Sequence, residues 1–370
     1  MSVETLIYSY LVICSSMIVF NCACIVVFRR RSVALQKRSS YLERQIAGQI
    51  KHIEAGEPVE DGHKQYLQKK LQQIKHLMAF DETLERLLGQ EPDAVWKYLG
   101  EIAPIFAHLS LENKYRNVIH ITYFAYIIKK YHVIQGKPDS PVISMMMKLL
   151  QEPGLYCREN AMQAICSSGD CICVLHALQT IDQGQWFHHE KMLTDNLLAF
   201  SGDSDHLANT LWNEFSSFSV QMRVVILDYI RFSGRNMQEE LLQLLADSRQ
   251  DDEIRFSCIR YFGKVPYEPA FPLLVTFLEN PNDNRWEYAA ISATALASYP
   301  CERSIEVLKK ALSNSNWYIR FNASKSLECF HLSYLELSDV MDGNDRYARE
   351  ILQYRMDLKK ARQEQGAALV

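Results

Sequence analysis

Residues 302–330 read ERSIEVLKKALSNSNWYIRFNASKSLECF, and this stretch decides the fold. Ile305, Leu308 and Leu312 recur at steps of three and four residues, which predicts a helix with one apolar face. The polar run 313–316 predicts a turn, and another helix follows with Ala323 on its apolar side. A pair of such short helices cannot cover its own apolar surface, so pairs must stack on one another.

The opening of the later helix recurs along the chain at steps of 32 or 33 residues. The recurring positions are Arg158, Lys191, Arg223, Arg255, Glu287 and Arg320. Three residues after each comes a mostly small or aliphatic residue, as close packing requires: Ala161, Thr194, Ile226, Cys258, Ala290 and Ala323. The tripeptides 168–170, 201–203 and 233–235 each carry Ser-Gly, where the Gly predicts a helix end. We call the helix that holds the recurring position the first helix of a unit and the next one its second helix.

This two-helix unit resembles the HEAT repeat, most of all the short phycobilisome-lyase-type HEAT-like repeats, over residues 140–335. Lys191 and Glu287 depart from the Arg that usually opens the first helix, without disturbing the period. The resemblance implies an all-α fold, an α-solenoid of HEAT-like helical repeats.

Both flanks of the repeats also predict helices. Residues 79–139 read as degenerate helical repeats, with Trp96, Leu99, Ile102 and Ile105 expected on one face. Residues 336–370 read as a C-terminal capping helix and tail, with the helix over 344–362 and a loose tail from Gln363. The apolar stripe of that helix is expected to be Tyr347, Ile351, Tyr354 and Leu358.

The N-terminus predicts a single-pass membrane anchor over residues 1–31. Leu6–Phe28 is a run of 23 residues without a charge, which as a helix spans about 34 Å against a hydrocarbon core of about 30 Å. The triplet Arg29, Arg30 and Arg31 follows, as at the cytoplasmic end of a membrane helix. We therefore expect a cell (inner) membrane protein with Met1–Thr5 outside, its repeats in the cytoplasm, and this triplet at anionic lipid headgroups.

A cleaved signal peptide is the alternative for this segment. The first five residues carry no Lys or Arg, the apolar run is longer than a usual signal, and no small-x-small cleavage site follows it. These three features favour the anchor. Within it, Asn21 is a candidate contact with a second membrane helix, beside the alternative of a tolerated polar residue.

Residues 32–78 predict a helical stalk between the anchor and the repeats. Leu42, Ile46, Ile50 and Ile53 form an apolar stripe, and the run Gly56-Glu57-Pro58 breaks the helix. A second helix is expected from His63 to about residue 78, antiparallel to the first.

Charge and cysteine usage limit the classes of partner. Residues 29–51 hold seven Lys or Arg against Glu43 alone, whereas the chain as a whole has a net charge of −4, so the repeat region is acidic. An acidic body disfavours nucleic acid as a partner. The ten Cys lie scattered among apolar neighbours, which is typical of reduced thiols in a cytosolic domain.

Two clusters suggest metal chemistry, and neither has a convincing pattern. His188-His189-Glu190 contains the His-Glu pair that HEAT-like di-iron hydroxylases repeat, but the pair occurs once here. Cys166, Cys171, Cys173 and His176 fit no standard zinc spacing, and buried thiols are the other reading. Neither a phosphate-binding G-x-x-x-x-G-K loop nor a G-x-S-x-G nucleophile elbow occurs. We therefore predict no catalytic residue, metal or cofactor.

The sequence thus predicts a non-enzymatic, membrane-tethered scaffold or adaptor that binds a protein partner through its solenoid. By analogy, it resembles a bacterial accessory subunit of a membrane enzyme that makes envelope components or polysaccharide. The second helices are expected to line a concave binding face, with hypothetical contacts at Glu239, Gln243, Glu306 and Lys309. A HEAT-like metalloenzyme, a lyase-type protein and a small-ligand sensor are the alternatives.

Overall fold

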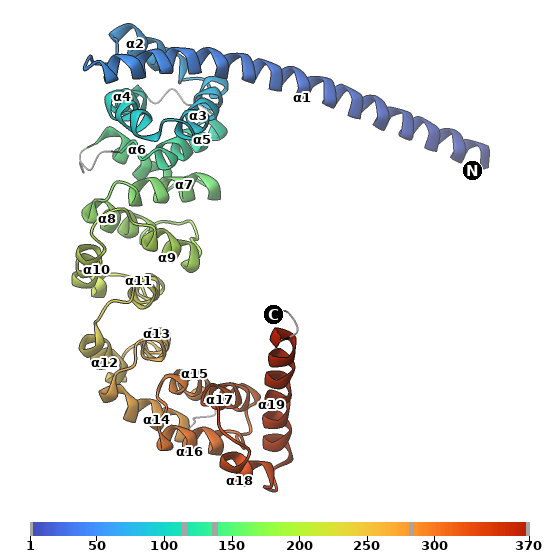
Figure 1. The fold of residues 1–370 in the computed structure, drawn as a ribbon, viewed down its shortest axis with the longest axis vertical. Coiled ribbons are helices and arrows are strands. Elements are labelled where there is room, and N and C mark those ends of the chain that lie inside the picture. Colours follow the sequence, from blue (N-terminus) through green and yellow to red (C-terminus); the bar gives the residue numbers. More distant parts are fainter. Residues whose placement is uncertain (1–2, 113–116, 135–139, 281–284, 368–370) are drawn as a thin grey trace. The chain divides into compact units, whose positions relative to one another are not determined.

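The fold is all-α, as predicted. The computed structural model describes residues 3–112, 117–134, 140–280 and 285–367, and within these ranges it contains nineteen α-helices, a few 3₁₀ turns and no strand (Figure 1). The chain divides into two units, of which unit 1 is Met1–Trp186 with Ala199–Gly202 and unit 2 is Phe187–Leu198 with Asp203–Val370. Each unit is described by itself.

Unit 1 stacks eight helices in two layers (Figure 1). The helices are α1 (Val3–Glu54), α2 (Asp61–Lys70), α3 (Ile74–Leu88), α4 (Pro92–Glu112), α5 (Val118–Lys130), α6 (Pro141–Leu149), α7 (Leu155–Cys166) and α8 (Cys171–Asp182). The end of α1 packs on α3, α3 on α5 and α5 on α7, while α2, α4, α6 and α8 form the other layer.

Unit 2 continues the same pattern with eleven helices. They are α9 (Glu190–Leu198), α10 (Ser204–Asn213), α11 (Val220–Ser233), α12 (Gln238–Ala246), α13 (Asp252–Lys264), α14 (Phe271–Glu279), α15 (Trp286–Ala295), α16 (Glu302–Ala311), α17 (Trp317–Cys329), α18 (Ser338–Met341) and α19 (Arg346–Ala367). The odd-numbered helices pack on one another in sequence, and α12, α14, α16 and α18 each cover the odd-numbered helix that follows.

The recurring Arg has a structural task that explains its period. In α7 and α17 it stands at the fourth residue of the helix and reaches back to carbonyl groups of the preceding turn. Arg158 Nη1 donates to the carbonyl oxygens of Glu152 and Pro153 at 2.9 and 2.7 Å, and Arg320 Nη1 donates to those of Asn314 and Ser315 at 2.7 and 3.1 Å. The guanidinium thereby satisfies backbone acceptors that no helix pairs.

The small residues and two of the three glycines behave as their spacing predicts. All six residues that follow the recurring position by three are buried. Gly169 and Gly234 have φ of 72°, the left-handed conformation that ends a helix at no steric cost to Gly. Gly202 instead allows two segments of backbone to lie close together, because a Cβ at position 202 would lie 2.3 Å from the Gly169 carbonyl oxygen.

The predicted stalk differs from the structure in two ways. α1 is one unbroken helix of 52 residues that includes the apolar segment, and its later part carries buried Leu42, Ile46 and Ile50 in the core of unit 1. The single helix expected after His63 is two helices, because a turn at 71–73 separates α2 from α3. The break near Gly56 is confirmed, since its φ is 84°.

The C-terminal helix also departs from the prediction. α19 runs to Ala367, so residues 363–367 are helical rather than loose, and 368–370 lie outside the described residues. The expected stripe is wrong, since Tyr347 and Tyr354 are 67% and 57% exposed. The buried residues are Ala348, Leu352 and Arg355.

An Arg in the core explains the shifted stripe. The Arg355 guanidinium lies 4.4 Å from the Phe321 ring centroid and 3.7 Å from the Glu328 carboxylate, so a charged residue occupies an apolar position. Arg349, at the fourth residue of α19, donates to the Gly343 carbonyl oxygen at 2.5 Å, as the recurring Arg does elsewhere. α19 is therefore the first helix of one more, incomplete unit.

In the degenerate region, Leu99, Ile102 and Ile105 are buried, whereas Trp96 is 42% exposed. The run Asn280-Pro281-Asn282-Asp283 also predicts a turn, and its last three residues lie outside the described residues.

Candidate functional site: the anchor, its junction and the exposed helical surfaces

The apolar part of α1 is a helix without a protein partner. Its mean hydropathy is 2.5 and none of that stretch is buried within the chain. Ile13, Val19 and Phe20 are 56%, 68% and 68% exposed. An apolar surface of this length is stable in hydrocarbon rather than in water, and the helix is long and apolar enough to cross a membrane. Asn21 is exposed on this helix.

The basic triplet lies where the apolar segment ends and α1 continues. Arg29, Arg30 and Arg31 are exposed, and the helix passes through them without a break. From Phe28 to Ser39, the first buried residue of α1, the helix advances about 16 Å. The apolar segment is thus joined to unit 1 by rigid helix.

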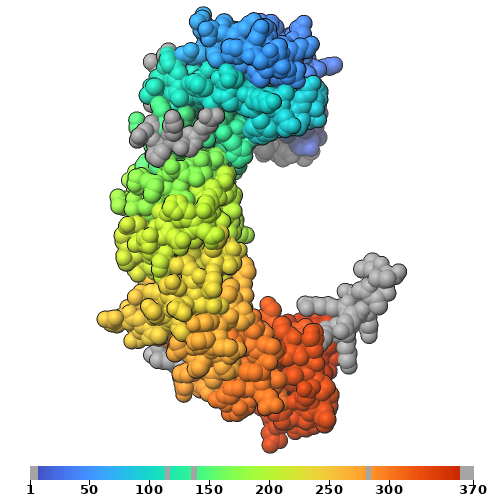
Figure 2. All heavy atoms as spheres, turned by 60° about the vertical axis from the view of Figure 1, so that its left-hand side comes forward, coloured from blue at the N-terminus to red at the C-terminus, as the bar shows by residue number. Residues whose placement is uncertain are grey.

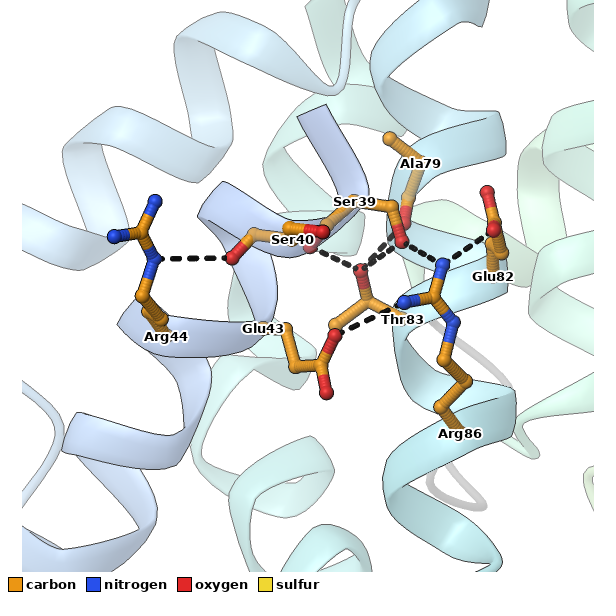
Figure 3. A network of polar contacts seen from close by, with 8 residues as sticks. All are labelled: Ser39, Ser40, Glu43, Arg44, Ala79, Glu82, Thr83 and Arg86. Atoms are coloured by element: carbon orange, nitrogen blue, oxygen red, sulfur yellow. Dashed lines mark hydrogen bonds and ion pairs between the residues drawn. The ribbon is translucent and has the colours of Figure 1, made fainter. Parts of the chain in front are cut away.

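A polar network fastens α1 to α3 at this junction (Figure 3). Ser39 and Thr83 are fully buried, their hydroxyl oxygens lie 3.2 Å apart, and Thr83 Oγ1 donates to the Ser39 carbonyl oxygen at 3.1 Å. Arg86 lies beside them, donating to Ser39 Oγ at 2.8 Å and to the Glu43 carboxylate at 3.1 Å, and it also pairs with Glu82. Because the hydroxyls are buried and bonded, the network fixes the register of α1 on α3.

The second-helix residues predicted as contacts divide into two pairs. Glu239 and Gln243 are exposed one turn apart on α12. Glu306 and Lys309 lie on α16 and line a groove of about 470 Å³, whose opposite side includes Leu332, Glu336, Asp339 and Val340. The structure does not bring the two pairs together.

Both residues on α16 already have partners within the chain. Glu306 accepts hydrogen bonds from Lys310 at 2.7 Å and Arg303 at 2.8 Å, which lower the pKa of its carboxyl to about 2. Lys309 Nζ donates to the Asp339 carboxylate at 2.8 Å and to the Glu336 carbonyl oxygen. These contacts compensate the charges of the groove within the chain, which weakens it as a binding site.

The expectation that second helices line the concave side is wrong for unit 2. Within that unit, α12, α14 and α16 follow the outer side of the curve, and α11, α13, α15 and α17 follow the inner side (Figure 1). Figure 2 brings the outer side forward, where these second helices form part of the yellow to orange surface.

Helices α11 and α13, which follow the inner side of unit 2, carry a cluster that sequence reasoning missed. Phe232 ends α11 with 48% of its surface exposed. The Arg231 guanidinium lies 4.4 Å from its ring centroid, and Lys264 Nζ from α13 lies 4.7 Å away. Such cation–π contacts hold both cations over the ring. We call Phe232, Arg231, Lys264, Asp228 and Arg260 the inner-face cluster.

Partial burial shifts the pKa values of two charged groups in this cluster. Asp228 lies 3.0 Å from Arg231, with side chains 24% and 16% exposed. Burial raises the pKa of the Asp228 carboxyl, opposed by Arg231 and Arg260, and burial lowers the pKa of Arg231. With three cations and one carboxylate, the cluster favours an acidic partner surface.

No protein-family model matches this chain, and no curated protein matches its sequence. The resemblance to HEAT-like repeats therefore stays a prediction.

The structure also describes the two clusters that were considered for metal binding. In the described part of the chain, no group of three or more His, Cys, Asp or Glu side chains is arranged to hold a metal ion. Cys166, Cys171 and Cys173 are buried, and burial raises the pKa of the Cys166 thiol to about 12. A thiol held neutral in an apolar seam is a poor metal ligand.

A second hollow lies between α5 and α7 in unit 1. It measures about 570 Å³ and is lined by Val118, Ile119, Leu155 and Tyr156, with Asp81 at its margin. The Asp81 carboxylate accepts hydrogen bonds from Tyr123, Tyr131 and Lys130 at 2.6–2.7 Å, so its charge is compensated. The surface left open is mainly apolar.

Proposed function

We propose that this protein is a membrane-anchored scaffold that binds a protein partner through its stacked helices. The observation that carries the proposal is the unbroken α1, whose first half is exposed and apolar and whose second half belongs to the core of unit 1. Such a helix holds a folded body at fixed distance from a bilayer, whereas a flexible linker would not.

The orientation follows from the distribution of positive charge. Arg29, Arg30 and Arg31 flank the apolar segment on the side of the folded units, and the first five residues carry neither Lys nor Arg. The positive-inside rule places the units in the cytoplasm, with the triplet at anionic headgroups and Met1–Thr5 outside. A signal sequence passes the same test of length and composition, so the proposal requires that α1 is retained.

The inner-face cluster of unit 2 is the surface best suited to the partner. Exposed aromatic and Arg side chains are enriched among residues that dominate binding energy. Phe232 combines a half-exposed ring with two cations already in place over it. We propose that the partner presents an acidic surface there. Glu239 and Gln243 offer a second, outer surface.

A setting for such a protein is the accessory subunit of a membrane enzyme of envelope or polysaccharide synthesis. The alternatives, a HEAT-like metalloenzyme or lyase-type protein and a small-ligand sensor, find less support. The charged residues that line the groove on α16 are paired within the chain, and the buried Cys166 thiol is held neutral. We propose a non-enzymatic role.

Co-purification from the native membrane tests the proposal. The full-length protein, extracted in mild detergent, is expected to bring down a stoichiometric partner identified by mass spectrometry. Phe232→Ala is expected to reduce recovery of the partner about tenfold or more, since truncation of a central aromatic contact typically costs about 2 kcal/mol or more. Phe187→Ala is the matched control, because Phe187 is 68% exposed elsewhere in unit 2.

Other outcomes assign the contact differently. Loss of the partner with Glu239→Lys and Gln243→Glu, but not with Phe232→Ala, moves binding to the outer surface. Loss of the partner with Asn21→Leu alone would assign the binding site to the membrane helix. A protein that retains its anchor and recovers no partner under cross-linking conditions contradicts the scaffold.

A further inference from the structure

The apolar segment of α1 projects from one side of unit 1. Hydrogen bonds between the helices show which helix ends lie on that side. Thr83 of α3 bonds Ser39, and Arg86 of α3 bonds Glu43, so the residue numbers of α1 and α3 rise together. The two helices therefore run parallel. The beginning of α3 lies on the side from which the apolar segment of α1 projects.

The same reasoning extends the alignment from α3 to α5. Tyr123 of α5 bonds Asp81 of α3, and Lys130 of α5 bonds Glu85 of α3. The later residue of α5 thus contacts the later residue of α3, so these two helices also run parallel. α5 therefore also begins on the side of the apolar segment.

α7 follows α5 in the same direction. Asn160 Nδ2 of α7 donates to the Thr122 carbonyl oxygen at 3.3 Å, and a Cβ on Gly154 would lie 3.7 Å from Val118. Gln72, just before α3, bonds Glu112 at 2.6 Å, which brings the end of α4 to this side as well. We call this surface, made by the starts of α3, α5 and α7 and the ends of α2 and α4, the span-side end of unit 1 (Figure 1).

The span-side end carries a group of exposed apolar side chains. They are Leu111, Val118, Ile119, Leu155 and Tyr156, with exposed fractions of 69%, 55%, 64%, 47% and 79%. Four of them also line the hollow of about 570 Å³ between α5 and α7. Apolar side chains gathered on one surface mark a contact with a protein or a membrane.

Basic residues accompany them on the same end. α2 ends in Lys69 and Lys70, and Lys75 opens α3. His76 lies close enough to Lys70, Lys75 and Arg38 that these cations help burial to lower the pKa of its imidazole. Apolar side chains beside clustered cations match an anionic phospholipid surface, where the former enter the interface and the latter meet headgroups.

We propose that the span-side end of unit 1 rests on the anionic phospholipid surface of the membrane that α1 crosses. The inference rests on the proposed anchor, because α1 alone brings this end to the bilayer. The helix rises only about 16 Å between Phe28 and Ser39, the first buried residue of α1, and α3, which bonds Ser39 through Thr83, begins nine residues before Thr83 and so extends about 14 Å back toward Phe28. Unit 1 is then held by a spanning helix and a lipid-facing surface together.

Photo-cross-linking of the full chain in a bilayer tests this contact. The photoreactive residue benzoylphenylalanine replaces Ile119 or Tyr156, and the protein is reconstituted into vesicles of phosphatidylglycerol and phosphatidylcholine. Trp96 is the matched control position, because it is 42% exposed and lies 6.2 Å from His132, beyond the opposite end of α5. We expect several-fold more lipid adduct at positions 119 and 156 than at 96.

Failure of this contact and failure of the anchor give different results. Extraction of the vesicles with alkaline carbonate precedes irradiation, and protein that is released shows that α1 does not span, which overturns both proposals. Protein that is retained but forms no excess lipid adduct overturns the lipid contact alone. Adducts of positions 119 and 156 with a co-reconstituted protein, in place of lipid, also overturn it.

Discussion

At the scale of single residues, the Arg255 side chain of α13 connects two other helices, α12 and α15, by hydrogen bonds. It is buried, its Nε donates to the Leu245 carbonyl oxygen at 3.0 Å, and its Nη1 donates to the Tyr288 hydroxyl at 3.0 Å. The guanidinium also lies 5.4 Å from the Phe277 ring centroid. A buried cation is tolerated here because its donors are used and aromatic faces surround it.

We therefore expect Arg255→Ala to destabilise unit 2. Loss of charge-assisted hydrogen bonds in a buried site leaves a carbonyl and a hydroxyl without their partner and lowers the free energy of unfolding by about 2–4 kcal/mol. Thermal unfolding of the full chain followed by circular dichroism measures the effect. Arg249→Ala, which removes an exposed Arg paired with Asp247, is the control and should leave the transition in place. Equal effects of both variants would refute the role of Arg255.

Buried and exposed thiols should differ in reactivity. Burial raises the pKa of Cys166 and of Cys258 to about 12, whereas Cys301 and Cys329 are exposed. Since the thiolate is the reactive form, iodoacetamide at about pH 8 should label the exposed pair and spare the buried pair. Peptide mass spectrometry reads the result. Rapid labelling of Cys258 in folded protein would contradict its burial.

The raised pKa values of Cys166 and Cys258 also determine how stability changes with pH. An unfolded thiol has a pKa of about 8.5, so the unfolded chain loses these protons before the folded chain does. The stability contributed by the two buried thiols is therefore complete below about pH 8.5 and declines as the pH rises toward 12.

At the scale of elements, the junction of α1 with α3 decides whether the membrane segment and unit 1 move together. Arg86→Ala removes the cation between Glu43 and Glu82 and the donor to buried Ser39 (Figure 3). Because Arg86 is about one-third exposed, we expect a loss of only about 1–2 kcal/mol. Hydrogen exchange of residues 39–50 should accelerate on the order of tenfold.

Arg44→Ala is the matched control for that variant. Arg44 is one turn away from Ser40 and donates only to its carbonyl oxygen, at 3.3 Å on the exposed side of α1. Exchange of residues 39–50 should stay unchanged with Arg44→Ala. Faster exchange with both variants would mean that α1 frays locally and that the network does not hold it.

Apolar spacing predicted most elements of the fold, and it failed where a charged residue is buried or where the apolar pattern runs on through a turn. The period of 32 or 33 residues places the helices of 140–335, because each unit repeats the same buried positions. It did not place the stripe of α19, where Arg355 is buried over Phe321. It also did not predict the turn at 71–73, since Leu71 and Leu77 are both fully buried and continue the apolar pattern across it.

At the scale of the whole molecule, the candidate sites were harder to predict than the fold. Sequence spacing identified exposed residues such as Glu239 and Gln243, but it assigned the second helices of unit 2 to the wrong side of the curve. The inner-face cluster around Phe232 joins residues of α11 and α13 that lie 28 or more positions apart, and no sequence motif predicts it. Surfaces of this kind arise from stacking and have no local signature.

The retention of α1 is the central claim, and intact-mass spectrometry of the membrane fraction tests it most directly. Membranes washed with alkaline carbonate should keep the protein, and the extracted chain should have the full mass of 42.9 kDa. The apolar segment would then be both present and embedded. A chain shortened by the first thirty or so residues and recovered in the carbonate wash would show that α1 begins as a cleaved signal, and would contradict the anchored scaffold.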